Sequence, residues 1–141
     1  MQVKMGLDAL RAFMDETFPQ VAEDFELLDV SPMHLVMRAL VHERHLRPGG
    51  TVSGPAMFAL ADVTMYLAIL AMIGPKALAV TTNCSIDFMR KPAAEANLRA
   101  EARLLKLGRV LAVGDVLIYS EGADAPVARA SLTYSIPPAQ G

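Results

Sequence analysis

The sequence has few of the features that mark disulfide-bonded, metal-binding or nucleic-acid-binding proteins. Only one of its 141 residues, Cys84, is a cysteine, which excludes an internal disulfide and every multi-cysteine metal site. With 13 basic and 15 acidic residues the formal net charge is -2, so nothing indicates a nucleic-acid-binding surface. Internal repeats, low-complexity tracts and linkers are also missing. We therefore expect a single domain over residues 1–141, with an N-terminal helix in 1–20 and a core in 21–137.

Three further motifs are missing. The first residues, MQVKMGLDAL, contain no apolar h-region, so we expect no signal peptide and a cytoplasmic protein. The turn Pro48-Gly49-Gly50 lacks the Gly-Lys-Ser/Thr ending with which a P-loop binds phosphate. His42 and His45 lie close together in the sequence, but this stretch offers too few convergent ligands for a metal site.

What the chain does have is one long apolar run, TVSGPAMFALADVTMYLAILAMIGP, over residues 51–75. It predicts a helix that is hydrophobic on nearly every face. Ser53 can cap its N-terminus and Pro55 suits its first turn. Gly74-Pro75 is typical of a helix end.

Asp62 is the one carboxylate inside this run. The 19 residues from Pro55 to Ile73 are long enough to cross a bilayer. A carboxylate near the centre would cost roughly 2.5–3.5 kcal/mol there, and the rest of the chain alternates as a soluble sheet does. We therefore expect a buried core helix and no membrane association.

The remaining sequence predicts an amphipathic helix over Gly6–Phe18 and several strands with period-two alternation. The strands are expected at 25–30, 33–42, 79–89, 97–107, 109–120 and 127–136. An antiparallel sheet of about six strands can curl around one apolar helix and bury it. The predicted fold class is therefore α+β.

The strand predicted at 79–89 carries two of the polar candidates, Thr81 and Asn83. Its alternation predicts Val80, Cys84 and Phe88 on one face, and Thr81 and Asn83 on the other. On this pattern Cys84 is expected to be a packed core residue, not a nucleophile.

The run GTVSGPAMFALAD, from Gly50 to Asp62, resembles the hotdog-fold acyl-CoA thioesterases, in particular the PaaI-like branch of phenylacetate degradation. That branch reads G-T-[VL]-H-G-G-x-x-x-x-L-x-D in this segment. Later stretches resemble the family in the same order, namely SIDFMRKP at 85–92, the segment 100–109 and the segment 127–134. The resemblance covers roughly residues 25–136.

The resemblance implies the hotdog fold, a curved antiparallel sheet wrapped round the long helix. It also implies a homodimer whose sheets join edge to edge, often paired into a tetramer. The implied reaction is hydrolysis of an acyl-CoA thioester to free acid and CoA, without a metal or redox cofactor.

Three positions carry the implied chemistry. Asp62 falls at the family's catalytic carboxylate, and Gly54 at the glycine whose backbone N–H polarises the thioester carbonyl. Thr81 falls where relatives carry a Ser or Thr that helps to place water, although an ordinary strand residue is an equal alternative. Whether Asp62 acts as a nucleophile or as a general base stays open.

Three positions depart from the family's pattern. Ser53 replaces the motif His, Pro55 replaces the second Gly, and Arg47 stands where an Asn often does. The missing His is expected to leave Asp62 more isolated than in its relatives. A non-hydrolytic acyl-CoA-binding protein on the same fold is therefore the alternative function.

Substrate-binding residues are expected around these positions. Ser53 is foremost a helix cap, whose hydroxyl could also touch the substrate; Arg47 and Asn83 are further candidates. Three basic residues at predicted strand ends and turns could hold the phosphates of CoA or could simply be solvated. They are Arg90, Lys91 and Arg109.

Gly54 and Asp62 are too far apart on one helix to act on the same thioester. The two are eight residues apart on one predicted helix, hence about 12 Å along its axis. They cannot both reach one thioester carbon at about 3 Å. A working site is therefore expected to take one of them from each of two chains.

Overall fold

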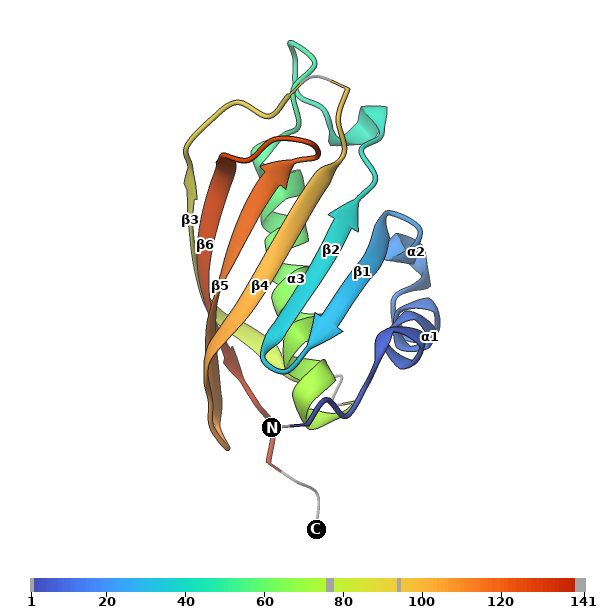
Figure 1. The fold of residues 1–141 in the computed structure, drawn as a ribbon, viewed down its shortest axis with the longest axis vertical. Coiled ribbons are helices and arrows are strands. Elements are labelled where there is room, and N and C mark those ends of the chain that lie inside the picture. The colour runs from blue at the N-terminus through green and yellow to red at the C-terminus, as the bar shows by residue number, and fades with distance from the viewer. Residues whose placement is uncertain (1, 76–77, 94, 139–141) are drawn as a thin grey trace.

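A computed structural model describes residues 2–75, 78–93 and 95–138. Within them a six-stranded sheet curves around one long helix, with two shorter helices beside its first strands (Figure 1). The elements are α1 (Leu7–Thr17), α2 (Pro19–Ala22), β1 (Phe25–Ser31), β2 (His34–Ala39), η1 (Glu43–His45), α3 (Gly54–Ile73), β3 (Val80–Phe88), β4 (Leu98–Leu107), β5 (Leu111–Ser120) and β6 (Pro126–Ser135). The strand order is β1-β2-β4-β5-β6-β3, and every pair is antiparallel. The predicted α+β architecture is confirmed.

The long helix α3 begins and ends where its sequence predicts. The Ser53 Oγ accepts a hydrogen bond from the Ala56 N–H at 3.2 Å and so caps its start. Gly74 follows its last residue with φ of 94°, a conformation that glycine adopts without steric cost. By length and composition α3 could cross a membrane, but 67% of its most apolar window is buried inside the protein. This burial is that of a core helix.

The core lies between α3 and the inner face of the sheet. Small residues alternate along the central strands and allow the helix to approach closely. A Cβ at Gly114 would lie only 2.5 Å from Met65 Cε of α3 and 2.6 Å from the Arg103 carbonyl oxygen. Inward positions of β4 and β6 are buried as the alternation predicts, namely Leu98, Ala100, Ala102, Leu104, Ala128, Ala130, Leu132 and Tyr134.

Strand β3 departs from the predicted alternation because it contains a β-bulge between Thr81 and Asn83. The register pairs Thr81 with the buried Tyr134, but Asn83 with Thr133 one position earlier on β6. An extra residue in one strand shifts the alternation by one. Thr81 therefore shares the inner face with Cys84, and the prediction that it shares a face with Asn83 is wrong.

Strand β3 also lies at the edge of the sheet, next to β6 alone. Its other edge has no partner in the part of the chain that the structure describes. Val80 is 55% exposed and Phe88 51% exposed, and Cys84 is only partly buried. Cys84 nevertheless packs against the core cluster, as expected, although the single chain leaves it partly exposed.

Candidate active site

Asp62 lies in the middle of α3 and is half-buried. Its Oδ1 accepts two hydrogen bonds, one from the Thr81 hydroxyl at 2.6 Å and one from the Tyr134 hydroxyl at 2.6 Å. The Tyr134 hydroxyl also lies 3.0 Å from the backbone carbonyl oxygen of Asp62. Asp62 is therefore not isolated, although Ser53 stands at the position of the motif His, because two strands supply hydroxyl donors.

The other carboxylate oxygen, Oδ2, has no hydrogen-bond partner among the described residues. No buried side-chain oxygen or nitrogen in them lacks a partner, so Oδ2 is accessible to solvent. Asp62 lines a cavity of about 420 Å³. The rest of the cavity lining is mostly apolar and includes Met14, Phe18, Val21, Val63, Tyr66 and Val80. The free oxygen therefore lies beside a cavity suited to an apolar group.

Aromatic rings fix the hydroxyl donor on β6. The Tyr134 ring stacks on Tyr66 of α3 at 6.1 Å between centroids, and Phe18 meets Tyr66 edge-on at 5.8 Å. Burial, followed by the hydrogen bond to Asp62, raises the pKa of Tyr134 far above its usual value. The hydroxyl therefore stays protonated and remains a donor at neutral pH.

The single cysteine lies near the same carboxylate. Burial, and then the negative charge of Asp62, raises the pKa of the Cys84 thiol. The thiolate is the nucleophilic form of cysteine. A catalytic thiol is therefore disfavoured at this position.

A second group of candidates gathers at the N-terminus of α3. Arg47, Gly54, Arg90 and Lys91 line one open cavity of about 780 Å³. As the first residue of α3, Gly54 has a backbone N–H without an intrahelical acceptor. The Phe88 ring lies 3.3 Å from where a Cβ on Gly54 would be, which leaves little room for a side chain.

Two of the predicted substrate-binding residues join neither group. Arg109 lies in the turn between β4 and β5, at the opposite end of the sheet from the loop before α3 (Figure 1). Asn83 is exposed on β3 and faces away from α3. Their roles stay predictions.

The contact of Tyr134 with Asp62 was not predicted from the sequence. The alternation of β6 shows only that Tyr134 points inward, and it does not show which group its hydroxyl contacts.

The family model named Thioesterase superfamily matches residues 49–127. The chain belongs to the thioesterase superfamily. Among solved structures, a candidate thioesterase from a Silicibacter species is 57% identical over 98% of this chain and 96% of its own, with a TM-score of 0.92. A mutant of the phenylacetic acid degradation protein PaaI from Thermus thermophilus is 29% identical over 84% and 99%, with a TM-score of 0.72.

A more distant member, a hypothetical thioesterase from Streptococcus pneumoniae solved with coenzyme A, is 22% identical over 94% of this chain and 100% of its own, with a TM-score of 0.77. At that identity the likeness shows the fold alone. No curated protein matches this chain by sequence. The prediction of a thioester hydrolase on the hotdog fold is confirmed by the family match and the closer structures.

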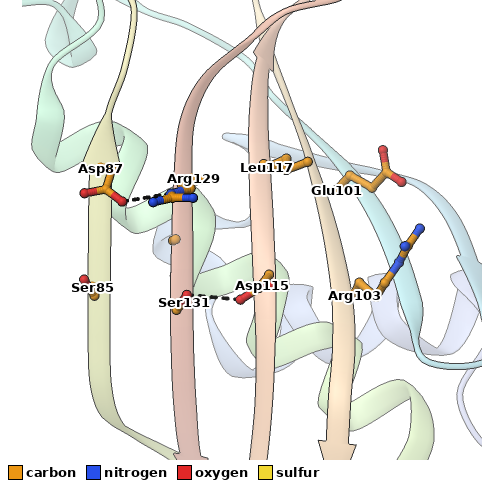
Figure 2. A pocket seen from close by; sticks show the side chains of 9 residues that line it. Ser85, Asp87, Glu101, Arg103, Asp115, Leu117, Arg129 and Ser131 are labelled. Carbon is orange, nitrogen blue, oxygen red and sulfur yellow. Dashed lines mark hydrogen bonds and ion pairs between the residues drawn. The ribbon is translucent and has the colours of Figure 1, made fainter.

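The hotdog sheet of this thioesterase also carries a polar cavity of about 580 Å³ on the face away from α3 (Figure 2). There Arg129 donates to Asp87 at 2.9 Å, and Ser131 donates to Asp115 at 3.1 Å. These carboxylates are exposed and lie on the opposite face of the sheet from Asp62. The half-buried acid of this cavity, Glu101, is paired with His34 at 2.8 Å, and most of the lining is polar, so we do not assign the hydrolase site to it.

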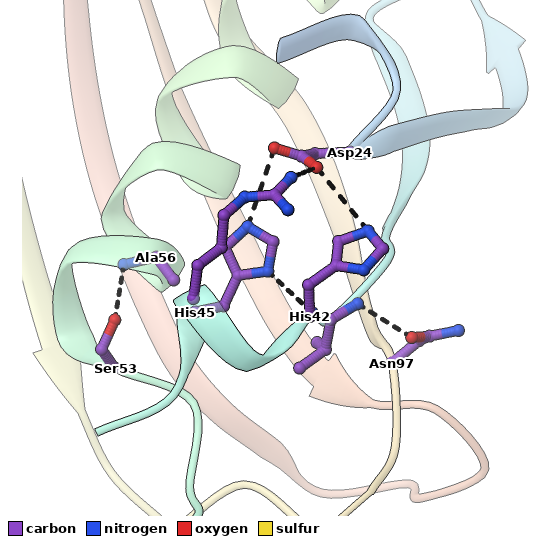
Figure 3. A network of polar contacts seen from close by, with 8 residues as sticks. Asp24, His42, His45, Ser53, Ala56 and Asn97 are labelled. Atoms are coloured by element: carbon purple, nitrogen blue, oxygen red, sulfur yellow. Dashed lines mark hydrogen bonds and ion pairs between the residues drawn. The ribbon is translucent and has the colours of Figure 1, made fainter. Parts of the chain in front are cut away.

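A polar network holds the loop that leads into α3 (Figure 3). Asp24, 8% exposed, forms an ion pair with Arg44 and lies 3.7 Å from a ring nitrogen of both His42 and His45. The His45 carbonyl accepts from the Ser53 N–H at 2.8 Å. Burial lowers the pKa of His45 although Asp24 opposes the shift. No group of side chains in the described part of the chain is arranged to hold a metal ion.

Proposed function

We propose that this thioesterase hydrolyses an acyl-CoA thioester at Asp62. The observation that carries the proposal is the half-buried carboxylate with one oxygen held by two hydroxyls and the other free beside an apolar cavity. The acyl group would occupy that cavity. The exposed Arg47, Arg90 and Lys91 would meet the phosphates of CoA.

Two routes fit this geometry. As a nucleophile, Oδ2 adds to the thioester carbon, the C–S bond breaks, CoA leaves as the thiolate, and water then opens the mixed anhydride. As a base, Oδ2 takes a proton from water, the water oxygen adds to the carbon, and the leaving sulfur receives the proton as the C–S bond breaks. In both routes Oδ1 remains a hydrogen-bond acceptor, so both hydroxyls keep their partner.

The proposed site needs a second copy of the chain. The cavities at Gly54 and at Asp62 share no lining residue, and the two residues lie eight positions apart on α3. Strand β3 presents an unpaired edge among the described residues, and unpaired edges template pairing with another chain. Beside it, α3 exposes an apolar stripe that includes Pro55, Phe58 and Ala59.

The positions on the two elements suggest how the copies meet. Phe58 lies halfway between Gly54 and Asp62 on α3. A two-fold axis near Phe58, with β3 pairing antiparallel to its copy, would place Gly54 of the partner subunit next to Asp62. The Gly54 N–H would then face the oxygen that becomes negative as the thioester reacts.

The first experiment measures hydrolysis of short, medium and aryl acyl-CoAs by the wild type and by Asp62→Asn. We expect hydrolysis of at least one substrate by the wild type, and a loss of roughly a thousandfold in the variant, because an amide can neither attack nor accept a proton. Asp87→Asn, on the outer face, is the matched control and should keep wild-type rates. Equal rates in wild type and Asp62→Asn would contradict the proposal.

A subunit-mixing experiment tests the two-chain site. Gly54→Pro removes the backbone N–H, and the extended Ser53 before it (φ -73°, ψ 155°) tolerates a following proline. Because proline also adds a Cβ 3.3 Å from the Phe88 ring, Gly54→Ala, which adds the same Cβ and keeps the N–H, is the steric control. Mixed after unfolding, the inactive Asp62→Asn and Gly54→Pro chains should recover about a quarter of wild-type activity, because half of the dimers would hold one intact site of two. No recovery in mixed dimers would show that both groups act within one chain.

The alternative, a non-hydrolytic acyl-CoA-binding protein, is favoured by one observation. The Ser53 hydroxyl, at the position of the motif His, accepts a hydrogen bond from the Ala56 N–H. It is used to cap α3 and is therefore not free to take over the role of the motif His. Calorimetric binding of acyl-CoA without turnover of any substrate in the panel would support this alternative over the hydrolase.

A further inference from the structure

We propose that Tyr134 is a positioning residue that, together with Thr81, holds Oδ1 of Asp62 and thereby presents Oδ2 to the substrate. This inference rests on the proposed hydrolysis at Asp62 and adds a residue to it. Tyr134 comes from β6, the strand between β5 and β3. Its hydroxyl is 2.6 Å from Oδ1.

The bulge in β3 is what makes the arrangement possible. Because of it, Thr81 lies directly opposite Tyr134 in the register of β3 and β6. Without the extra residue Thr81 would face away from α3, as regular alternation predicts. Bulges next to functional sites often redirect one side chain. Here the bulge sets a second hydroxyl 2.6 Å from the same carboxylate oxygen.

The Tyr134 hydroxyl has little freedom to move. The side chain is only 3% exposed, its ring stacks on Tyr66, and the hydroxyl lies within 3.0 Å of the Asp62 carbonyl oxygen as well. A carboxylate with one oxygen held by two donors cannot rotate freely about its last bond. Its second oxygen therefore keeps one direction, which is how positioned groups gain effective concentration.

The two donors meet a charged acceptor, and hydrogen bonds to a charged group are worth roughly twice those between neutral groups. The cavity residues from α1, from α2 and from the position between them are the apolar Met14, Val21 and Phe18, so they offer no side-chain donor to Asp62. Loss of the Tyr134 hydroxyl should therefore loosen the carboxylate and lower the rate of the chemical step.

The decisive variant is Tyr134→Phe, which removes the hydroxyl and keeps the ring. We expect kcat to fall about tenfold or more and KM to stay within about twofold. Tyr119→Phe is the matched control. Tyr119 lies on β5 under the Arg99 guanidinium at 4.9 Å, away from the cavity, and its variant should match the wild type in both quantities.

A second series of variants distinguishes the effect of the Thr81 hydroxyl from the effect of its side-chain shape. Thr81→Val should lower kcat in the same way, whereas Thr81→Ser, which keeps a hydroxyl, should retain most of it. The double variant Tyr134→Phe with Thr81→Val frees Oδ1 altogether. Its loss should differ from the product of the single losses, because both donors act on one atom.

The outcomes distinguish this inference from the proposed function. An active wild type with an unchanged kcat in Tyr134→Phe, even with a lower melting temperature, would make the tyrosine merely structural and overturn the inference. If the wild type hydrolyses nothing, the proposed function fails. NMR spectra of isotope-labelled aspartate carboxyls then decide, because an unchanged Asp62 carboxyl signal in Tyr134→Phe would overturn the inference as well.

Discussion

The start and the middle of α3 are built in opposite ways. At the start, the proposed functional group is the backbone N–H of Gly54, and three exposed cations line the cavity beside it. In the middle, the proposed functional group is the Asp62 side chain, held by neighbouring hydroxyls beside apolar residues. The first region suits phosphates that stay in water, and the second suits chemistry that needs partial desolvation.

The two regions also differ in how complete they are within one chain. The contacts of Asp62 with Thr81 and Tyr134 are made by the chain itself. The Gly54 N–H points to no acceptor in its own helix. In each proposed site, the region around Asp62 is therefore complete within one chain, whereas the Gly54 N–H must come from a second copy. The following predictions test this difference between the two regions.

Among changes that spare both Asp62 and Gly54, the largest effect is expected at Phe58, because both regions of the site depend on it. Phe58 is 39% exposed on the apolar stripe of α3, and Phe58→Glu would place two like charges near the proposed axis. We expect a folded monomer by sedimentation and circular dichroism, and a loss of hydrolysis on the order of a hundredfold or more.

Leu105→Glu is the control for that change. Leu105 is 60% exposed on β4, away from the stripe, and its variant should keep both the dimer and the activity. A Phe58→Glu protein that is monomeric and fully active would contradict the two-chain site, because Asp62 would then act without Gly54 of a second copy.

The next effect should fall on the start of α3 alone. Arg47→Gln combined with Lys91→Gln should raise KM for acyl-CoA about tenfold and leave kcat nearly unchanged, because charges on the phosphates affect binding more than reaction. The measurement is repeated with an acyl-pantetheine thioester, which lacks the nucleotide. An equal rise in KM for that substrate would show that the cations do not meet the phosphates.

A smaller effect is expected on stability. Ser53→Ala removes the cap bond to the Ala56 N–H and should lower the free energy of unfolding by about 1 kcal/mol. Ser53→Thr keeps an acceptor and should lose much less. Chemical denaturation measures both, and a loss of activity in Ser53→Ala beyond its loss of stability would mean that the hydroxyl also touches substrate.

The smallest effect concerns the loop before α3. Burial lowers the pKa of His45 in the folded state, whereas the unfolded state keeps the ordinary value of about 6.5. As the pH falls through that value, the unfolded state binds protons first, so stability is full above it and declines below it. Between about pH 7.5 and 5.5, His45→Asn should therefore lose less melting temperature than the wild type. An equal loss of melting temperature in both proteins would show that His45 does not cause the decline in stability at low pH.

Local sequence was enough to predict the helix α3, the strands, and the positions of Gly54 and Asp62 on that helix. Ser53, Pro55 and Gly74 mark the ends of α3 through rules that act within one turn of chain, and the motif around Asp62 indicates the family. The bulge in β3 was not predictable, because the run from Thr81 to Asn83 is polar throughout and does not show which of its residues faces the core. The face of a strand depends on how its neighbour pairs with it.

Tyr134 shows where sequence reasoning ends. Its alternation predicts burial on β6, and burial is what the structure shows. That its hydroxyl meets a carboxylate 72 positions earlier in the chain depends on the curvature of the sheet around α3 and on the order of the strands. The order of residues alone specifies the apolar helix, its single acid and the glycine at its start. Which oxygen of that acid is held and which is free depends on the three-dimensional fold, because a hydroxyl's partner is set by packing across the fold and not by neighbours in the chain.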